Sequence, residues 1–398
     1  MERFYFSTVF AAVSHGKARG WLTLLLAFIA CFSSCRSDDD PLVPSTQTPV
    51  APGEDGPVKG FFLLNEANMG SNKASLDYFD YGSGIYHKNI FPERNPGIVK
   101  ELGDVGNDIR IYGDKLYAVI NCSHLVEIMD VNTARHVATI SIPNCRYIAF
   151  DKGYAYVSSY AGPVKIDPNA RLGYVAKVDT ALLQVVDTCV VGYQPEEMVV
   201  RDNKLYVANS GGYRVPDYDN TVSVIDLDRF KETKKITVAI NLHRMELDRY
   251  GNIWVSSRGD YYNVRSKTYI IDTSTDLVTD VLHLLPNSNM TLRGDSLYVY
   301  STEWSYITNS NTISYAIVNT KTKKVVNRNF ITDGTEKKIE IPYGIAVHPE
   351  TGDIFVTDAK DYVTPGTLYC FSPGGKKKWE VTTGDIPAHI VFTRRKME

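Results

Sequence analysis

Residues 197–238 read EMVVRDNKLYVANSGGYRVPDYDNTVSVIDLDRFKETKKITV, and this stretch decides the fold. It holds short runs rich in Val, Ile, Leu and Tyr, which occupy residues 197–200, 204–209, 221–226 and 234–238. Alternating or continuous apolar runs of this length predict β-strands rather than helices. The turn Arg201-Asp202-Asn203 between the first two runs has the composition of a tight hairpin. The stretch therefore predicts four consecutive antiparallel strands.

The same four-strand pattern recurs along the chain, each time with an aromatic residue in its second strand. These aromatic residues are Phe62, Tyr117, Tyr156, Tyr206, Trp254, Tyr298 and Phe355. Self-similarity at a period of roughly 40 to 55 residues is typical of radial or solenoid arrays. Because each repeat supplies one four-stranded sheet, the radial arrangement is favoured. The sequence predicts an all-β protein: a seven-bladed β-propeller of four-stranded antiparallel blades.

The two ends of the repeat array complement each other. The first repeat begins at residues 60–65, which form a second strand with no first strand before it. The last repeat begins a first strand at residues 388–393, after which the repeat is not continued. Pairing the two would remove two exposed sheet edges. We therefore expect the C-terminal strand to close the ring as the innermost strand of the N-terminal blade.

Composition and motifs argue against several classes of function. The 398 residues carry a formal net charge of −3, and no basic stripe interleaved with aromatics appears, which speaks against a nucleic-acid partner. The sequence has no H-E-x-x-H, G-x-S-x-G, G-x-G-x-x-G or EF-hand pattern, and no phosphate-binding loop ending in Gly-Lys-Ser or Gly-Lys-Thr. We expect a protein that is not an enzyme, although a propeller hydrolase assembles its site from scattered loops.

The N-terminal segment predicts export. Lys17 and Arg19 precede an apolar run at residues 21–32, which is followed by Ser33-Ser34-Cys35. This is the pattern of a bacterial lipoprotein signal, so residues 1–35 are expected to be a signal peptide with an acylated Cys35. Cys31 is the competing lipidation site.

The residues after the signal are acidic and then rich in proline. The run Arg36-Ser37-Asp38-Asp39-Asp40 resembles the surface-export signal of Bacteroidetes lipoproteins, with a solvated linker as the alternative. Residues 36–58 are expected to form a disordered surface tether, because residues 41–58 are rich in Pro, Ser, Thr and Gly. The propeller is then expected to span residues 59–398.

Four cysteines follow the signal, and an exported protein meets an oxidising compartment. Cys122 and Cys145 lie in loops expected on the same face, and whether they form a disulfide stays open because sequence does not fix connectivity. Cys189 and Cys370 lie inside predicted strands and are expected to be buried thiols.

Loop lengths distinguish the two faces of the predicted propeller. The connections between second and third strands emerge on the same face as the connections between repeats, and they are longer than the hairpins opposite. Long loops on one side of a compact scaffold indicate a working surface, which we call the loop face.

The loop face is rich in aromatic and amide side chains. They suit a large, flat ligand with an amide rim, or another protein, although some of the tyrosines are also explained as braces between loops. The candidate binding residues are Asn65, Asn68, Asn121, His124, Tyr160, Asn209, Tyr213, Arg214, Arg258, Tyr261, Tyr262, Glu303, Trp304, Tyr306, Asp361 and Tyr362.

A second candidate site lies at the predicted channel mouth. His243 and His389 are expected there with Glu196 or Glu197, which are side chains that bind metals. The usual alternative is a polar channel lining with its hydrogen bonds satisfied. No ligand spacing in the sequence favours the metal.

Several loop phrases resemble a known family. They are Glu93-Arg94-Asn95-Pro96, GDVGND at residues 103–108, AVINCSH at 118–124, GYQPEE at 192–197 and VANSGGY at 207–213. These phrases, together with the lipidation signal, resemble the vitamin B12-binding surface lipoproteins of gut Bacteroides, the BtuG family. Val-Ala-Asn followed by Val-Ile-Asp is also found across YncE-like seven-bladed propellers.

The resemblance implies a function. It implies capture of cobalamin or cobinamide at the cell surface by a lipid-anchored outer-membrane protein, and transfer to a TonB-dependent B12 transporter. Arg214 or Arg258 is then expected to meet the phosphate of the nucleotide loop. The alternatives are a propeller that lids a transporter for another nutrient, and a hydrolase or lactonase with an axial metal.

Overall fold

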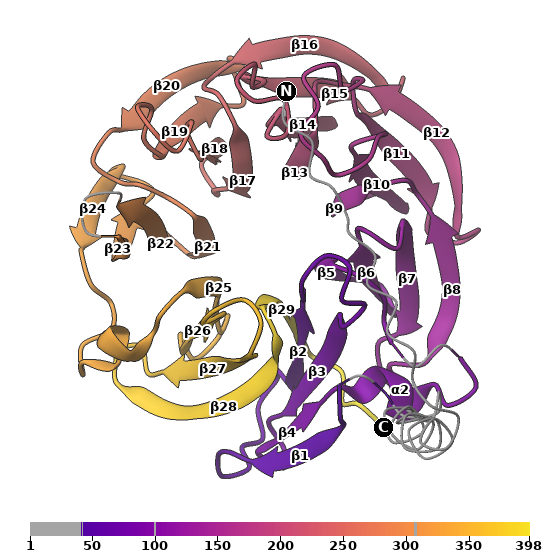
Figure 1. Cartoon of the computed structure of the whole chain (residues 1–398), viewed down its shortest axis with the longest axis vertical. Coiled ribbons are helices and arrows are strands. Elements are labelled where there is room, and N and C mark those ends of the chain that lie inside the picture. Colours follow the sequence, from indigo (N-terminus) through magenta and orange to yellow (C-terminus); the bar gives the residue numbers. More distant parts are fainter. Residues whose placement is uncertain (1–40, 42, 99–100, 306–308) are drawn as a thin grey trace, which may run out of the picture. The chain divides into compact units, whose positions relative to one another are not determined.

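The computed structural model describes residues 41, 43–98, 101–305 and 309–398, which all belong to one compact unit, Pro41–Glu398. Its strands form seven sheets arranged around an axis, as Figure 1 shows. All strand pairs within the sheets are antiparallel. The predicted seven-bladed propeller is confirmed.

The blades follow the chain in order. Blade 1 contains β1 (Thr46–Pro49), β2 (Gly60–Asn65), β3 (Ser75–Asp80), β4 (Ile85–Lys88) and β29 (Pro387–Thr393). Blade 2 contains β5 (Gly106–Tyr112), β6 (Lys115–Ile120), β7 (Leu125–Asp130) and β8 (His136–Ser141). Blade 3 contains β9 (Cys145–Asp151), β10 (Tyr154–Ser159), β11 (Tyr174–Asp179) and β12 (Gln184–Val190).

Blades 4 to 7 repeat the pattern. Blade 4 contains β13 (Pro195–Arg201), β14 (Lys204–Asn209), β15 (Thr221–Asp226) and β16 (Lys231–Thr237). Blade 5 contains β17 (Leu242–Leu247), β18 (Asn252–Ser257), β19 (Lys267–Asp272) and β20 (Leu277–Leu282). Blade 6 contains β21 (Asn289–Arg293), β22 (Ser296–Ser305), β23 (Ser310–Asn319) and β24 (Lys324–Asn327). Blade 7 contains β25 (Pro342–Val347), β26 (Ile354–Asp358), β27 (Pro365–Phe371) and β28 (Lys377–Asp385).

Two short helices interrupt the strands in the described part of the chain: α2 (Ile90–Arg94) and the 3₁₀ helix η1 (Thr335–Lys338). Ile90 and Phe91 of α2 are buried in the core between blades 1 and 2. Neither helix is long and apolar enough to cross a membrane.

The recurring aromatic residues hold neighbouring blades together. The buried apolar residues form seven clusters, each drawn from two adjacent blades. Each cluster contains one member of the predicted series: Phe62, Tyr117, Tyr156, Tyr206, Trp254, Tyr298 or Phe355. The aromatic position therefore marks the contact between blades, which is why it recurs with the repeat.

The ring closes as predicted. β29 pairs antiparallel with β2, from Gly60 opposite Thr393 to Leu64 opposite His389. β29 is the innermost strand of blade 1, in the place that β5 takes in blade 2.

The predicted tether is wrong for the residues that the structure describes after position 42. Within this segment β1 pairs antiparallel with β4 and forms a fifth, outermost strand of blade 1. Asn89 fixes the start of the segment by donating to the carbonyl of Val43 at 2.6 Å. An outer strand has unpaired backbone groups that a passing segment can satisfy, and proline is tolerated on such an edge. Residues 1–40, including Cys31 and Cys35, lie outside the described residues.

Candidate functional site

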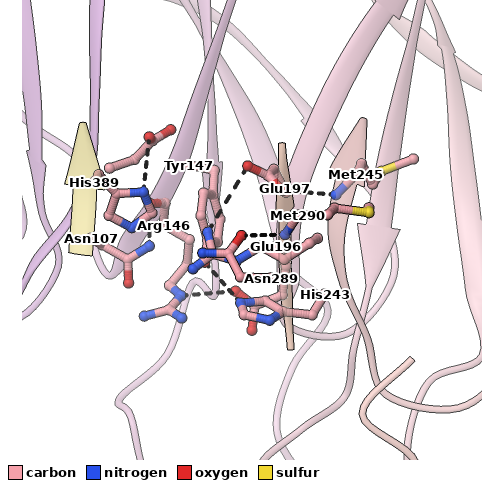
Figure 2. Close-up of polar contacts among 12 residues, drawn as sticks. Asn107, Arg146, Tyr147, Glu196, Glu197, His243, Met245, Asn289, Met290 and His389 are labelled. Carbon is pink, nitrogen blue, oxygen red and sulfur yellow. Dashed lines mark hydrogen bonds and ion pairs between the residues drawn. The ribbon is translucent and has the colours of Figure 1, made fainter. Parts of the chain in front are cut away.

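The innermost strands begin with a backbone irregularity that turns polar side chains towards the axis. The register between first and second strands shifts near the start of β5, β9, β13, β17, β25 and β29. A bulge places two consecutive residues where the partner strand has one, and so re-aims their side chains. Figure 2 shows the result: side chains of Arg146, Tyr147, Glu196, Glu197 and His243 lie close together in the centre.

The carboxylate of Glu196 is the acceptor shared by one group of these contacts. Glu196 is fully buried, and it accepts hydrogen bonds from Arg146 Nε at 3.1 Å and from the hydroxyl of Tyr160 at 2.5 Å. Arg258 Nη2 reaches the same carboxylate at a longer distance of 3.4 Å. A buried carboxylate needs such partners, because its desolvation is otherwise costly.

Glu197 is the acceptor shared by a second group of contacts. It accepts hydrogen bonds from the backbone of Met245 at 2.7 Å and from Arg110 at 3.2 Å, and it lies 4.0 Å from Arg244 Nη1. These contacts surround one end of an axial cavity of about 150 Å³. Burial, followed by the charge of Glu197, raises the pKa of Glu246 in this cavity to about 8. Glu246 is therefore largely protonated at neutral pH.

The two axial histidines are neutral. Burial, followed by repulsion from Arg258 and Arg244, holds the pKa of His243 well below its usual value. Burial, followed by the charge of Arg244, also holds the pKa of His389 well below its usual value. His243 Nε2 lies 2.9 Å from the hydroxyl of Tyr147. Within the described residues no group of three or more His, Cys, Asp and Glu is arranged to hold a metal ion.

A large cavity opens beside the axis on the loop face. Its volume is about 930 Å³, and blades 5, 6 and 7 provide its lining. The lining residues are His243, Arg244, Arg258, Tyr261, Tyr262, Val264, Arg265, Ser266, Asn287, Ser288, Tyr300, Thr302, Glu303, Trp304, Asn311, Thr312, Ile341, Pro342, Tyr343 and Tyr362. We call it the loop-face cavity.

Aromatic side chains stand exposed at the rim of this cavity. Tyr262 is 76% exposed and Trp304 is 52% exposed, although large aromatic side chains are usually more buried than this. Tyr362 is also exposed, and its ring meets that of Tyr343 edge-to-face with centroids 6.0 Å apart. The exposed rings cluster over one cavity, so they form a platform rather than scattered surface positions.

Two short turns hold the aromatic loops in unusual conformations. Tyr261 and Tyr362 both have φ of 64°, in the left-handed region that non-glycine residues rarely adopt. Asp260 accepts the backbone N–H groups of residues 262–264, and Asp361 accepts those of residues 363 and 364. Hydrogen bonds to Thr364 and Val363 lower the pKa of Asp361 to about 2. Both carboxylates thus build the loops that carry the aromatics.

Six of the predicted binding residues line the loop-face cavity. They are Arg258, Tyr261, Tyr262, Glu303, Trp304 and Tyr362. Burial raises the pKa of Glu303, with Arg265 acting against it. Tyr306 lies outside the described residues.

Four predicted binding residues are instead buried in the scaffold. Asn65, Asn121, Tyr160 and Asn209 are at most 3% exposed. Asn121 donates to the carbonyl of Cys145 at 2.9 Å, which fastens the loop between blades 2 and 3. Asn65 donates to Ser75, and Tyr160 to Glu196. The prediction of these four as ligand contacts is corrected, because side chains at the ends of these second strands turn into the scaffold and bond to their own or the next blade.

The remaining predicted residues do not line the cavity but brace loops. Asn68 donates to the carbonyl of Tyr362, and His124 Nδ1 accepts the N–H of Asn144 at 3.1 Å. Tyr213 donates its backbone N–H to Gln194 at 2.7 Å. Arg214 stacks 3.7 Å over the ring of Tyr193 and donates to the carbonyls of Asp217 and Pro168, so it joins the loops of blades 3 and 4. Asp361 acts through the turn described above.

Asn209→Ala is expected to destabilise the fold without acting on the loop-face cavity. The Asn209 amide bonds to the N–H of Gly192 at 3.1 Å, Thr221 at 3.0 Å and Ser223 at 2.9 Å. Leaving such buried partners unsatisfied costs about 2–4 kcal/mol in total. Urea unfolding measures this loss. An unchanged midpoint together with altered ligand affinity would contradict the scaffold role.

Part of the cavity lining was not among the residues predicted from sequence. Asn287, Ser288, Thr302, Asn311 and Thr312 face the cavity from blade 6. β22 and β23 are each ten residues long and extend past the length of the other strands towards the loop face. The sequence signal for this extension is short: only Thr312-Ile313-Ser314-Tyr315 alternates, ahead of the apolar run at residues 316–318.

The four cysteines that the structure describes are free thiols. Cys189 and Cys370 are buried, as predicted. Cys122 and Cys145 are not bonded to each other, and Cys145 Sγ lies 3.5 Å from the carbonyl of Ile120. Burial raises the pKa of the Cys145 thiol to about 12.

A family model described as "Domain of unknown function (DUF5074)" matches residues 59–393. The chain belongs to the DUF5074 family. The match ends at Thr393, the last residue of β29, so the DUF5074 unit includes the strand that closes the ring. No curated protein matches the chain in sequence.

Solved structures resemble this DUF5074 protein in fold. A quinoprotein alcohol dehydrogenase-like protein from Bacteroides thetaiotaomicron aligns with a TM-score of 0.56 and 13% identity, over 85% of this chain and 79% of that one. Hydrazine synthase from Kuenenia stuttgartiensis aligns with a TM-score of 0.53 and 17% identity, over 67% of this chain and 76% of that one. Identities this low speak for a shared architecture alone.

Proposed function

We propose that this protein binds a corrinoid, cobalamin or cobinamide, in the loop-face cavity. The observation that carries the proposal is the cavity itself: about 930 Å³ in volume, with exposed aromatic rings at its rim. Ligand pockets of a few hundred to about 1,000 Å³ accept cofactor-sized molecules. A corrin is a broad disc, so flat rings such as Trp304 and Tyr262 offer it matching surface.

The polar lining suits the edge of a corrin. A corrin carries amide arms, each of which offers hydrogen-bond donors and an acceptor. Asn311 supplies a complementary amide group, and Ser288 and Thr312 supply hydroxyl groups. Arg258, Arg265 and Glu303 add charge to the lining, and the amides and hydroxyls match the neutral rim of a corrin.

Backbone strain at the rim supports a binding role. Residues held in rare backbone conformations cluster at ligand sites, because the surrounding structure must maintain them at a cost of about 1–3 kcal/mol each. Tyr261 and Tyr362 are held in this way, on different blades. Asp260 and Asp361 hold these two turns, so the rim aromatics are preorganised.

The proposal extends to location and partner. The signal pattern at residues 1–35 supports lipidation at Cys35 and display on the bacterial outer membrane. We infer that the bound corrinoid passes to a TonB-dependent outer-membrane transporter of the B12 type. Binding rather than catalysis is the assigned role, since the axial acids pair with Arg146 and Arg110.

Calorimetric titration with cyanocobalamin and with dicyanocobinamide tests the proposal. We expect one-to-one binding of both ligands, with a Kd below ~1 µM. Haemin is the control, because it is a flat macrocycle of similar width whose rim carries carboxylates. Absence of saturable binding by either corrinoid would contradict the proposal, as would equal affinity for haemin.

A further inference from the structure

Two arginines form the inner floor of the loop-face cavity. Arg244 comes from the bulged start of β17, and Arg258 follows the end of β18 in the same blade. Both line the cavity, together with the neutral His243 that precedes Arg244. Arg244 is only 7% exposed, so its charge lies inside the protein and yet borders an open space.

The protein leaves part of the hydrogen-bonding capacity of these arginines unused. Arg244 Nε is buried and has no hydrogen-bond partner within the described part of the chain. The guanidinium of Arg244 approaches Glu197 no closer than 4.0 Å. Arg258 reaches Glu196 at 3.4 Å, whereas Arg146 and Tyr160 already bond the same carboxylate at 3.1 and 2.5 Å. A buried donor without a partner points to a missing acceptor.

Local charge favours an anion as that acceptor. Burial lowers the pKa of His243 most, and the charges of Arg258, Arg244 and Arg146 lower it further. Nearby Glu66 has its pKa raised by burial, so it opposes these cations less than an ordinary carboxylate would. The floor of the cavity is thus a positive, partly desolvated site, where a charge-assisted contact is stronger than on the surface.

We propose that Arg244 and Arg258 form an anion subsite that binds the phosphodiester of the nucleotide loop of a complete corrinoid. This inference rests on the proposed function. A phosphodiester presents two charged oxygens on one phosphorus, which match the planar fork of a guanidinium. Arg214, the other residue that the sequence suggested for this role, is engaged with Tyr193 and Asp217.

The subsite separates two corrinoids by their chemistry. Cobalamin carries the nucleotide loop with its phosphodiester, and cobinamide lacks both. We expect the wild-type protein to bind cobalamin at least ~10-fold more tightly than cobinamide, since a charge-assisted hydrogen bond contributes about 1.5–3 kcal/mol.

Arginine variants test the subsite by calorimetry with both ligands. Arg258→Met is expected to weaken cobalamin binding ~10-fold or more while cobinamide binding changes less than ~2-fold. Arg244→Met is expected to act in the same way, and Arg258→Lys to restore part of the loss. Arg110→Met is the matched control: it removes a cation from Glu197 but does not line the loop-face cavity. It is expected to leave the cobalamin-to-cobinamide ratio unchanged.

The outcomes distinguish this inference from the proposed function. If Arg258→Met weakens the binding of both corrinoids equally, or of neither, the subsite is overturned. Binding of cobinamide by the wild-type protein would still support corrinoid capture in that case. Titration with inorganic phosphate alone separates the two sources of the anion. Saturable phosphate binding at micromolar concentration that is unaffected by bound cobalamin would overturn the assignment to a nucleotide loop. Because Arg258 is on the cavity surface, with its side chain 25% exposed, its variant keeps the test valid if Arg244→Met fails to fold.

Discussion

A chain that ends at Ile386 is expected to lose its cooperative unfolding transition altogether. Removal of β29 leaves β2 without its inner partner and uncovers Phe61, Phe62, Leu63 and Leu64, which are fully buried. Burial of each such side chain contributes about 1.5–3 kcal/mol, and the total approaches the 5–15 kcal/mol that stabilises a typical domain. β29 also packs beside β5 and β25, so the contacts to both neighbouring blades are lost.

Circular dichroism and calorimetry on the truncated chain measure this effect. A chain that ends at Arg395 is the control, because it keeps β29 and loses only the last residues, with hydrogen bonds such as that from Glu398 to Asn132. The control is expected to melt cooperatively, close to the full-length chain. Melting of the shorter chain at the same temperature would show that the ring does not depend on its closing strand.

The second large effect is expected at the rim of the loop-face cavity. Trp304→Ala and Tyr262→Ala are each expected to weaken corrinoid binding ~30-fold, since truncation of a central aromatic at a binding surface costs about 2 kcal/mol or more. Both side chains are exposed, so the free energy of unfolding is expected to change by less than ~0.5 kcal/mol. Calorimetric titration and urea unfolding of the same preparations measure the two quantities.

Tyr250→Ala is the matched control for these variants. Tyr250 is also an exposed tyrosine of blade 5, but it lies in the turn between β17 and β18, on the face opposite the loop face. Its removal is expected to leave corrinoid affinity unchanged. Wild-type affinity in both Trp304→Ala and Tyr262→Ala would remove these residues from the site.

Strand positions were predictable from sequence because alternation and turn chemistry act locally. The predicted strands at residues 204–209 and 221–226 coincide with β14 and β15. The recurring aromatics were also predictable, because every repeat contacts the next blade through the same position of its second strand. Ring closure followed from counting unpaired strand edges at the two ends.

The missed features depend on contacts between distant segments. β1 reads Thr-Gln-Thr-Pro and has no strand signal of its own; the edge of β4 supplies its partner. Asn209 and Trp304 both lie at the ends of second strands, but Asn209 is buried in blade 4 whereas the long β22 carries Trp304 to an exposed position. Which polar residue faces a ligand depends on bulges and strand length, which residue type alone does not encode.

The pairing of β2 with β29 also bears on biogenesis. β2 leaves the ribosome among the first parts of the propeller, and its partner leaves among the last, so blade 1 stays incomplete until nearly the whole chain has emerged. Pairings so distant in sequence form slowly, and an open strand edge invites association with other chains. Prematurely terminated products therefore keep an open edge at β2, where we expect them to associate with other chains.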